Sequence, residues 1–221
     1  MQRRAADKRI TPVRVVGGEG VTLEGELAIP DNARGVVIFA HGSGSSRHSP
    51  RNQFVARELR SAGLGTLLFD LLTSKEDAVY ETRFDIDLLS KRLAVATTWF
   101  RQQPGGKGLG IGYFGASTGA AAALIAAAEM GSGVGAVVSR GGRPDMAERE
   151  LSRVTAPTLL IVGGLDDVVI DLNRRAYTQL RCEKEIVIVP GATHLFEEPG
   201  TLEEVARLAS EWFVRWLPPK G

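Results

Sequence analysis

Cysteine and long apolar runs are scarce in this sequence of 221 residues. A single cysteine, Cys182, excludes an intrachain disulfide and a cysteine-based zinc cluster, and it favours a reducing compartment such as the cytoplasm. The longest purely apolar run, Ala120 to Ala128, has nine residues, whereas a membrane-spanning helix needs about 20. We therefore expect a cytoplasmic chain that does not bind a membrane.

Net charge is also nearly absent, because 27 Lys and Arg residues are balanced by 26 Asp and Glu residues, which leaves a formal charge of +1. No basic cluster interleaved with aromatic residues is present, so the chain lacks the electrostatic pattern of a nucleic-acid-binding protein. Residues 1–10 are positively charged without a following apolar stretch, unlike a secretory signal. The length favours one domain, covering residues 1–221.

Short apolar runs alternate with longer segments of helical period. The third and later runs are apolar throughout, which is typical of strands covered on both faces. Residues 86–100 and 202–216 repeat apolar side chains at the spacing of amphipathic helices, and Thr201 with Glu204 predicts a capping box. Ser49-Pro50 is expected to start a shorter helix. The strand candidates are Val13–Val16, Val21–Ile29, Gly35–Ala40, Gly65–Phe69, Gly108–Phe114, Val134–Ser139, Thr158–Val162 and Glu185–Val189.

The order of these runs predicts an α/β fold. Two hairpin-like strands followed by strand–helix repeats indicate a mostly parallel, doubly wound sheet with an antiparallel edge and flanking helices. Ligands of such sheets bind at the carboxyl ends of the strands. The residues that directly follow each strand are therefore the candidates for chemistry.

The sequence GASTG, residues 115–119, stands between a strand candidate and the strong helix former Ala120–Met130. It matches G-x-S-x-G in the strand–turn–helix context that holds a nucleophilic serine at the tip of a sharp, strained turn. The two glycines let strand and helix approach without a side-chain clash. We predict that Ser117 is the nucleophile; a glycine-rich turn without a reactive group is the alternative.

A nucleophilic serine needs a general base. Of the three histidines, His194 lies on a loop after the last strand candidate, which suits a base at the carboxyl edge. His41 belongs to a glycine-rich stretch and is expected to have a different role, and His48 lies in a polar loop where we expect it to be solvated. His194 is therefore the predicted base.

The base needs an orienting acid. Asp166 is the first carboxylate after the turn that follows the seventh strand candidate, and Asp145, after the sixth, is the main alternative. Asp171 is expected to cap the following helix. The predicted triad of Ser117, Asp166 and His194 has the chain order of α/β-hydrolases.

The stretch His41-Gly42-Ser43-Gly44 follows the third strand candidate, where this mechanism needs a backbone N–H aimed at developing negative charge. We expect the backbone N–H groups of Ser43 and Thr118 to form the oxyanion hole, since Thr118 follows the nucleophile at a helix N-terminus. A loop whose glycines only make a turn is the alternative.

Arg140 follows the sixth strand candidate on the same edge. It is a candidate substrate contact that would orient an acidic group through a bidentate hydrogen bond. An ion pair with Asp145 or Glu148 is the alternative.

The order strand–HGSG–helix, GASTG, GGLDD and GATH resembles the α/β-hydrolase superfamily, and the compact layout resembles its dienelactone hydrolase-like branch over about residues 12–217. The resemblance implies an α/β-hydrolase fold of eight strands and hydrolysis through an acyl-enzyme. Dienelactone hydrolases carry a cysteine where this chain has Ser117, which favours a serine esterase over a lactone hydrolase.

We therefore predict a serine hydrolase that cleaves carboxylic esters of small molecules without a metal or organic cofactor. Residues 140–157 have room for one helix but not for a cap domain, and residues 71–83 alone could cover the site in part, so small or short-chain acyl groups are expected. A thioesterase, acyltransferase, perhydrolase or lactone hydrolase on the same triad stays open, as does a non-catalytic binding module.

Gly110 to Gly115 also matches G-x-G-x-x-G, the fingerprint of dinucleotide binding. These glycines fall inside a strand candidate instead of the turn that would cradle a phosphate. Gly106-Lys107 lacks the Ser or Thr that a phosphate-binding loop needs next. Nucleotide binding is therefore not expected.

Overall fold

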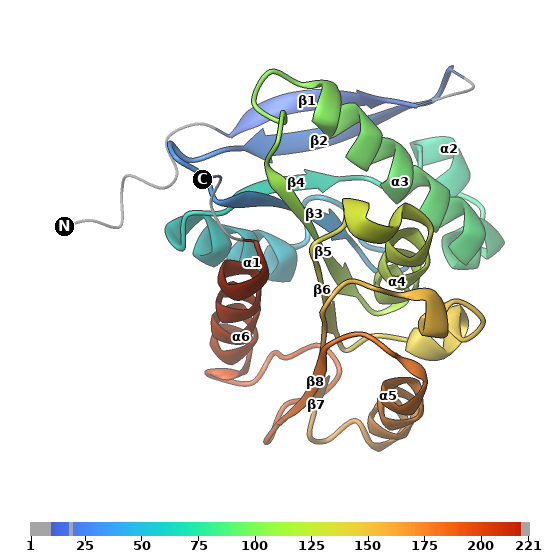
Figure 1. Ribbon diagram of the computed structural model, residues 1–221. Coiled ribbons are helices and arrows are strands. Elements are labelled where there is room, and N and C mark those ends of the chain that lie inside the picture. The colour runs from blue at the N-terminus through green and yellow to red at the C-terminus, as the bar shows by residue number, and fades with distance from the viewer. Residues whose placement is uncertain (1–9, 18–19, 218–221) are drawn as a thin grey trace.

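Eight strands form one mixed sheet in the computed structural model, which describes residues 10–17 and 20–217 (Figure 1). Their order is β1-β2-β4-β3-β5-β6-β7-β8, with β2 antiparallel to β1 and β4 and all later pairs parallel. The strands are β1 Thr11–Val16, β2 Thr22–Ala28, β3 Gly35–Ala40, β4 Gly65–Phe69, β5 Gly110–Ala116, β6 Ala136–Arg140, β7 Thr158–Gly163 and β8 Lys184–Val189. The predicted α/β-hydrolase sheet is confirmed.

Helices cover both faces of this sheet. The helices are α1 Pro50–Ser61, α2 Ser74–Asp77, α3 Ile86–Gln102, α4 Thr118–Met130, α5 Asp167–Gln179 and α6 Thr201–Trp216. Helices α1 and α6 lie on one face, and α3, α4 and α5 lie on the other (Figure 1). Four-residue helix α2 and the 3-10 turn η2, Glu81–Phe84, occupy the connection between β4 and α3, where partial cover was predicted.

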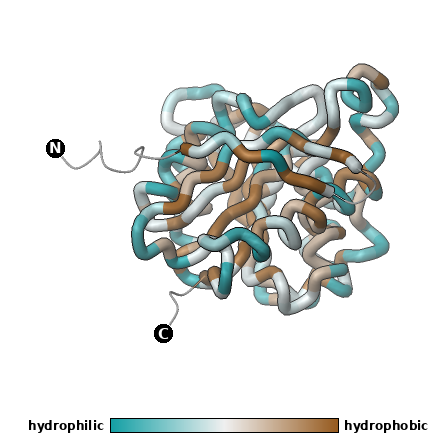
Figure 2. The backbone as a smooth tube through the Cα atoms, turned by 90° about the horizontal axis from the view of Figure 1, so that it is seen from above, coloured by the Kyte–Doolittle hydropathy of each residue, from teal (hydrophilic) through white to brown (hydrophobic). Residues whose placement is uncertain are grey.

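The central strands are apolar throughout because both of their faces are buried. Along β3, Val36 and Ile38 pack toward α3 and α4, whereas Val37 and Phe39 pack toward α1 and α6. Figure 2 shows hydrophobic segments through the middle of the molecule and hydrophilic segments on its outer loops. Alternate side chains of a strand point to opposite faces, so a strand between two helical layers must be apolar at every position.

The predicted capping box at Thr201 is wrong. Helix α6 already begins at Thr201, with Gly200 at φ 84° before it, and the Thr201 hydroxyl donates to the Glu198 carbonyl oxygen at 2.7 Å. Glu204 pairs with Arg207 instead. The left-handed backbone of Gly200 brings the chain into the helix one residue earlier than the S/T-x-x-E pattern indicates, so the hydroxyl cannot reach back as a cap.

The chain between β6 and β7 forms two short 3-10 turns, η4 Pro144–Ala147 and η5 Leu151–Arg153, and not the single helix that its length allowed. No cap domain lies there, which agrees with the predicted open fold. None of the helices in the described part of the chain is long and apolar enough to cross a membrane. The prediction about residues 1–10 falls on a segment that, apart from Ile10, lies outside the described residues.

Candidate active site

Ser117 occupies a strained turn between β5 and α4. Its backbone has φ 51° and ψ −122°, in the region that side chains other than glycine rarely adopt. A Cβ atom on Gly115 would lie 2.4 Å from the Ala120 Cα atom, and one on Gly119 would lie 2.2 Å from the Ala40 carbonyl oxygen. Both flanking glycines are therefore required, and the turn presents Ser117 at the carboxyl edge of the sheet.

His194 and Asp166 come together from two separate loops. The His194 Nδ1 and Asp166 Oδ2 atoms are 2.7 Å apart. Asp166 is the residue before α5, but its carboxylate makes no helix-capping hydrogen bond; it is turned to the imidazole instead. This contact places hydrogen on Nδ1 and leaves Nε2 as the ring nitrogen that can accept a proton.

Ser117 and His194 both border the turn that follows β6. The Ser117 N–H donates to the Arg140 carbonyl oxygen at 3.2 Å. A Cβ atom on the next residue, Gly141, would lie 3.6 Å from His194 Cε1. Ser117 Oγ has no hydrogen-bond partner among the described residues, and such contacts often shorten only when substrate binds.

The other acidic candidates are engaged elsewhere. Asp145 accepts two hydrogen bonds from Arg143, at 2.9 and 2.7 Å. Asp171 does not cap a helix as expected; it lies inside α5, 3.7 Å from an Arg174 nitrogen, because the helix begins four residues earlier at Asp167. Asp166 is thus the carboxylate that contacts His194.

The stretch from His41 to Gly44 packs directly on the serine turn. A Cβ atom on Gly42 would lie 3.2 Å from the Ser117 Cβ atom, and Gly44 has φ 68°. The Ser43 N–H, one of the two predicted oxyanion donors, donates to Thr118 Oγ1 at 2.9 Å. The Thr118 N–H, the other predicted donor, belongs to the first residue of α4, at the positive end of the helix dipole.

His41 holds this stretch in place. Its Nε2 atom accepts the Leu71 N–H at 3.0 Å, and its Nδ1 atom lies 3.0 Å from the Gly42 carbonyl oxygen. A neutral imidazole with hydrogen on Nδ1 satisfies both contacts. Burial lowers the pKa of His41, and the hydrogen bond to Gly42 opposes that shift only in part. His41 therefore joins the two loops after β3 and β4 as a neutral, structural group, separate from the Asp166 pair.

Arg140 is buried beside the serine turn. Its side chain is 5% exposed, its Nη2 atom donates to Asn52 Oδ1 at 3.3 Å, and its guanidinium lies 5.9 Å from the centre of the Phe196 ring. Neither Asp145 nor Glu148 pairs with it, and among the described residues its Nε atom has no partner. Burial, together with nearby Arg51, lowers the pKa of Arg140 to about 10.

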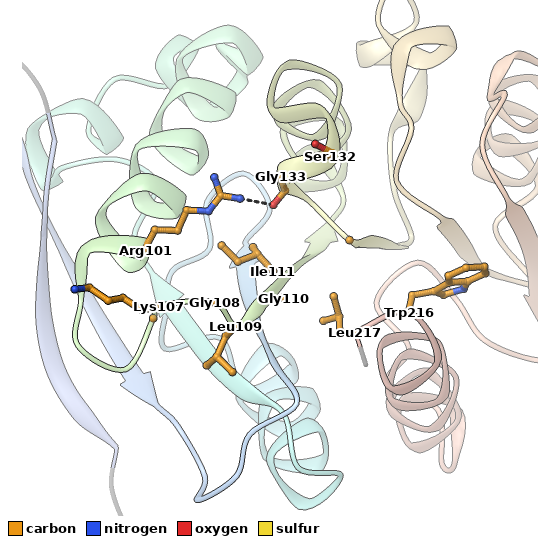
Figure 3. Close-up of a pocket in the computed structure, with 12 residues that line it drawn as sticks. Arg101, Lys107, Gly108, Leu109, Gly110, Ile111, Ser132, Gly133, Trp216 and Leu217 are labelled. Atoms are coloured by element: carbon orange, nitrogen blue, oxygen red, sulfur yellow. Dashed lines mark hydrogen bonds between the residues drawn. The ribbon is translucent and has the colours of Figure 1, made fainter. Parts of the chain in front are cut away.

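Hollows border the sheet at both edges. At the carboxyl edge, a cavity of about 350 Å³ lies between the His41 stretch and α2, with Asp70, Leu72 and Asp77 in its wall. At the amino edge, a hollow of about 550 Å³ lies below the start of β5, bordered by Arg101, whose side chain donates to the Gly133 carbonyl oxygen, and by Trp216 (Figure 3). Ser117, His194 and Asp166 are not part of that larger hollow.

Two contacts of the site were not anticipated from the sequence. The Thr118 hydroxyl is a partner of Ser43, although the sequence indicates a role only for the Thr118 N–H, and Asn52 reaches Arg140 from α1. Asn52 carries no sequence signal because it is 88 positions away from Arg140 along the chain. In the described part of the chain, no group of three or more His, Cys, Asp or Glu side chains could hold a metal ion.

The sheet order and the serine turn define an α/β-hydrolase fold. The model of the dienelactone hydrolase family matches residues 23–217, so the chain belongs to that family. A dienelactone hydrolase from Anabaena variabilis, known from its crystal structure, is 56% identical over 94% of this chain and 98% of its own, with a TM-score of 0.92. Est1E from Butyrivibrio proteoclasticus shares the fold at 15% identity, with a TM-score of 0.80 over 93% of this chain and 98% of its own.

Curated relatives come from two strains of Mycobacterium tuberculosis and are provisionally named phosphoribosyl transferases. They are 57% identical over 209 residues, which is 95% of this chain and 47% of each relative. The chain therefore spans about half the length of the curated relatives that it matches.

Proposed function

We propose that this chain is a serine hydrolase that cleaves carboxylic esters through an acyl-enzyme. Ser117 Oγ attacks the acyl carbon while His194 Nε2 takes its proton, and the alcohol leaves with a proton returned by His194. Asp166 holds the imidazole in the required tautomer and stabilises the imidazolium. Water then attacks the acyl-enzyme with the same base, and the acid is released.

The contact of 2.7 Å between His194 Nδ1 and Asp166 Oδ2 is the observation that carries this proposal. It joins an imidazole to a carboxylate beside a serine held at φ 51°. A purely structural serine would not need such a backbone, which costs about 1–3 kcal/mol. Membership of the dienelactone hydrolase family supports hydrolysis as the reaction class.

The open edge of the sheet favours substrates with small or short-chain acyl groups. No cap domain covers Ser117 in the described chain, and a cavity of about 350 Å³ lies beside the His41 stretch at this edge. Apolar side chains of Val79, Tyr80 and Phe84 are exposed on the segment that borders it. An acyl group of a few carbons fits such a space, whereas a long chain would extend into water.

The surroundings of Arg140 favour a substrate that carries an acidic group. A buried guanidinium costs several kcal/mol unless an anion or hydrogen-bond acceptors compensate it. Arg140 is only 5% exposed, and Asn52 Oδ1 is the one side-chain acceptor that it contacts within the described chain. A substrate carboxylate near Ser117 would supply the missing partner. We therefore propose Arg140 as a substrate contact.

Lactone hydrolysis is the second candidate. The Anabaena protein at 56% identity is named a dienelactone hydrolase, and a lactone is an ester whose alcohol stays attached to the acyl group. The same triad can open it. The transferase name of the mycobacterial relatives belongs to proteins about twice as long, and here Gly110, Gly112 and Gly115 are paired inside β5, where they cannot cradle a phosphate.

Labelling with a fluorophosphonate tests the proposal. The unmodified chain should be labelled once per molecule and should hydrolyse 4-nitrophenyl acetate, because both reactions need an activated serine. Ser117→Ala should remove the label and lower kcat/KM by at least about 10⁴-fold. Equal labelling of the Ser117→Ala variant would show that another residue is the nucleophile.

A further inference from the structure

The Thr118 hydroxyl lies between the two parts of the expected oxyanion hole. Thr118 directly follows Ser117 and begins α4, and its side chain is 4% exposed. Its Oγ1 atom accepts the Ser43 N–H at 2.9 Å. The Ser43 stretch is pressed against the serine turn at Gly42, so this contact is part of the site and not of a distant loop.

The hydrogen of the Thr118 hydroxyl has no acceptor among the described residues. A threonine hydroxyl can donate one hydrogen bond and accept two. Here the oxygen accepts from Ser43, and no described group accepts its hydrogen. A nearly buried donor without an acceptor is energetically unfavourable. The serine turn beside it is where the hydrolytic reaction develops a negative charge.

We propose that the Thr118 hydroxyl is itself an oxyanion donor, polarised by the Ser43 N–H. This inference rests on the proposed ester hydrolysis. The oxyanion then receives two hydrogen bonds from the same residue, one from the Thr118 N–H and one from Thr118 Oγ1–H. Ser43 acts through the hydroxyl, because its own N–H is already donated to Oγ1.

This arrangement works when charge develops on the substrate oxygen. As Ser117 Oγ bonds to the acyl carbon, the carbonyl π electrons move to oxygen and the serine proton moves to His194. No proton leaves Thr118; its hydrogen bond only shortens as the acceptor becomes charged. A donor that is already hydrogen-bonded as an acceptor is a stronger donor, since neighbouring hydrogen bonds polarise one another.

A competing arrangement makes the opposite prediction. If the substrate oxygen needed the Ser43 N–H for itself, the Thr118 hydroxyl would block the hole and would have to be displaced. Removing the hydroxyl would then raise the rate. Substitution at Thr118 therefore separates a donor from a blocker by the direction of the change in kcat.

Thr118→Val and Thr118→Ser test the inference on the full chain. Valine keeps the shape of threonine without the hydroxyl, and serine keeps the hydroxyl. We expect Thr118→Val to lower kcat for 4-nitrophenyl acetate by on the order of 10²-fold with little change in KM, as for loss of one oxyanion donor. Thr118→Ser should stay within about fivefold of the unmodified chain. The rate of labelling by fluorophosphonate, whose phosphoryl oxygen uses the same hole, should fall with kcat.

Thr97→Val is the matched control. Thr97 is fully buried in α3, and its hydroxyl bonds to the Tyr113 hydroxyl at 2.6 Å, so its loss should lower the thermal midpoint and leave kcat unchanged. An unchanged or raised kcat in a folded Thr118→Val variant overturns the inference while Ser117→Ala still abolishes activity. An unmodified chain that reacts no faster than Ser117→Ala overturns the proposed hydrolysis and this inference with it.

Discussion

The two ends of strand β5 lie in very different surroundings. At its amino end, Gly110 and Ile111 line the larger hollow, together with Arg101 and Trp216 (Figure 3). At its carboxyl end, the strand runs into Ser117. The loops after β7 and β8 bring a carboxylate and an imidazole to the same edge, and β6 ends there with the buried Arg140. The smaller hollow lies beside the His41 stretch, and its wall does not include Ser117, Asp166 or His194.

Neither hollow is lined by Ser117, Asp166 or His194, so the size of a hollow does not indicate where the polar side chains gather in this molecule. The carboxyl ends of parallel strands are followed by loops that converge, and these loops carry the polar side chains. At the amino end the chain instead completes its packing: a Cβ atom on Gly112 would lie 2.6 Å from the Phe213 ring, and one on Gly135 would lie 2.8 Å from Leu217. Substitutions at the two ends should therefore affect different properties.

The largest effect on activity after Ser117 is expected at Asp166. Asp166→Asn keeps the size of the side chain but favours the wrong imidazole tautomer, so kcat should fall by on the order of 10³- to 10⁴-fold. Asp145→Asn is the matched control at the same edge, since Asp145 pairs with Arg143, and its kcat should stay within about threefold. Steady-state kinetics with 4-nitrophenyl acetate measures both, and a larger loss in Asp145→Asn would reassign the acid.

A smaller effect, on selectivity, is expected at Arg140. Arg140→Met should lower the ratio of kcat/KM for a 4-nitrophenyl hydrogen glutarate ester over the uncharged valerate ester by about 10- to 100-fold, the loss of one charge-assisted hydrogen bond. Arg143→Met, which removes a guanidinium that already has a carboxylate partner, should leave this ratio unchanged.

Arg140→Lys separates substrate binding from a structural role of Arg140. It keeps the positive charge, so it should retain part of the preference for the anionic ester even where packing around Asn52 and Phe196 is disturbed. If the ratio for Arg140→Met equals that of the unmodified chain, no substrate carboxylate contacts Arg140.

The smallest effect is expected at the amino edge of the sheet. Arg101→Ala removes the hydrogen bond to the Gly133 carbonyl oxygen at 2.6 Å, and an exposed contact of this kind contributes less than about 1 kcal/mol. The thermal midpoint should fall by no more than about 4 °C, and kcat/KM should stay within about twofold. A tenfold loss of activity would link the larger hollow to the reaction and would break the contrast between the two edges.

The sheet was predictable because its signals are local. Strands that lie between two helical layers are apolar at every position, and β3 and β4 begin and end at the predicted residues. The start of α6 was not predictable, because the left-handed backbone of Gly200 and the contact of Thr201 with Glu198 depend on how the preceding loop folds. Termini of helices respond to such contacts more than their interiors do.

The candidate site shows the same division. The G-x-S-x-G turn and the positions of Asp166 and His194 after strands followed from spacing alone. The spacing left Asp145 open as the acid, and it left an ion pair of Arg140 with Asp145 or Glu148 as an alternative to a substrate contact. The structure instead pairs Arg143 with Asp145 and leaves Arg140 with Asn52, which comes from helix α1.

By itself, the sequence determined the eight-stranded α/β-hydrolase sheet, the serine turn and the edge at which chemistry must be sought. These follow from apolar periodicity and from glycines that the turn requires. Only the tertiary structure decided which carboxylate meets His194 and that the Ser43 N–H is donated to the Thr118 hydroxyl. It also decided that Arg140 is buried without a carboxylate partner from residues 10–17 or 20–217. Those outcomes depend on distances between residues far apart in the chain, and the spacing of motifs does not specify such distances.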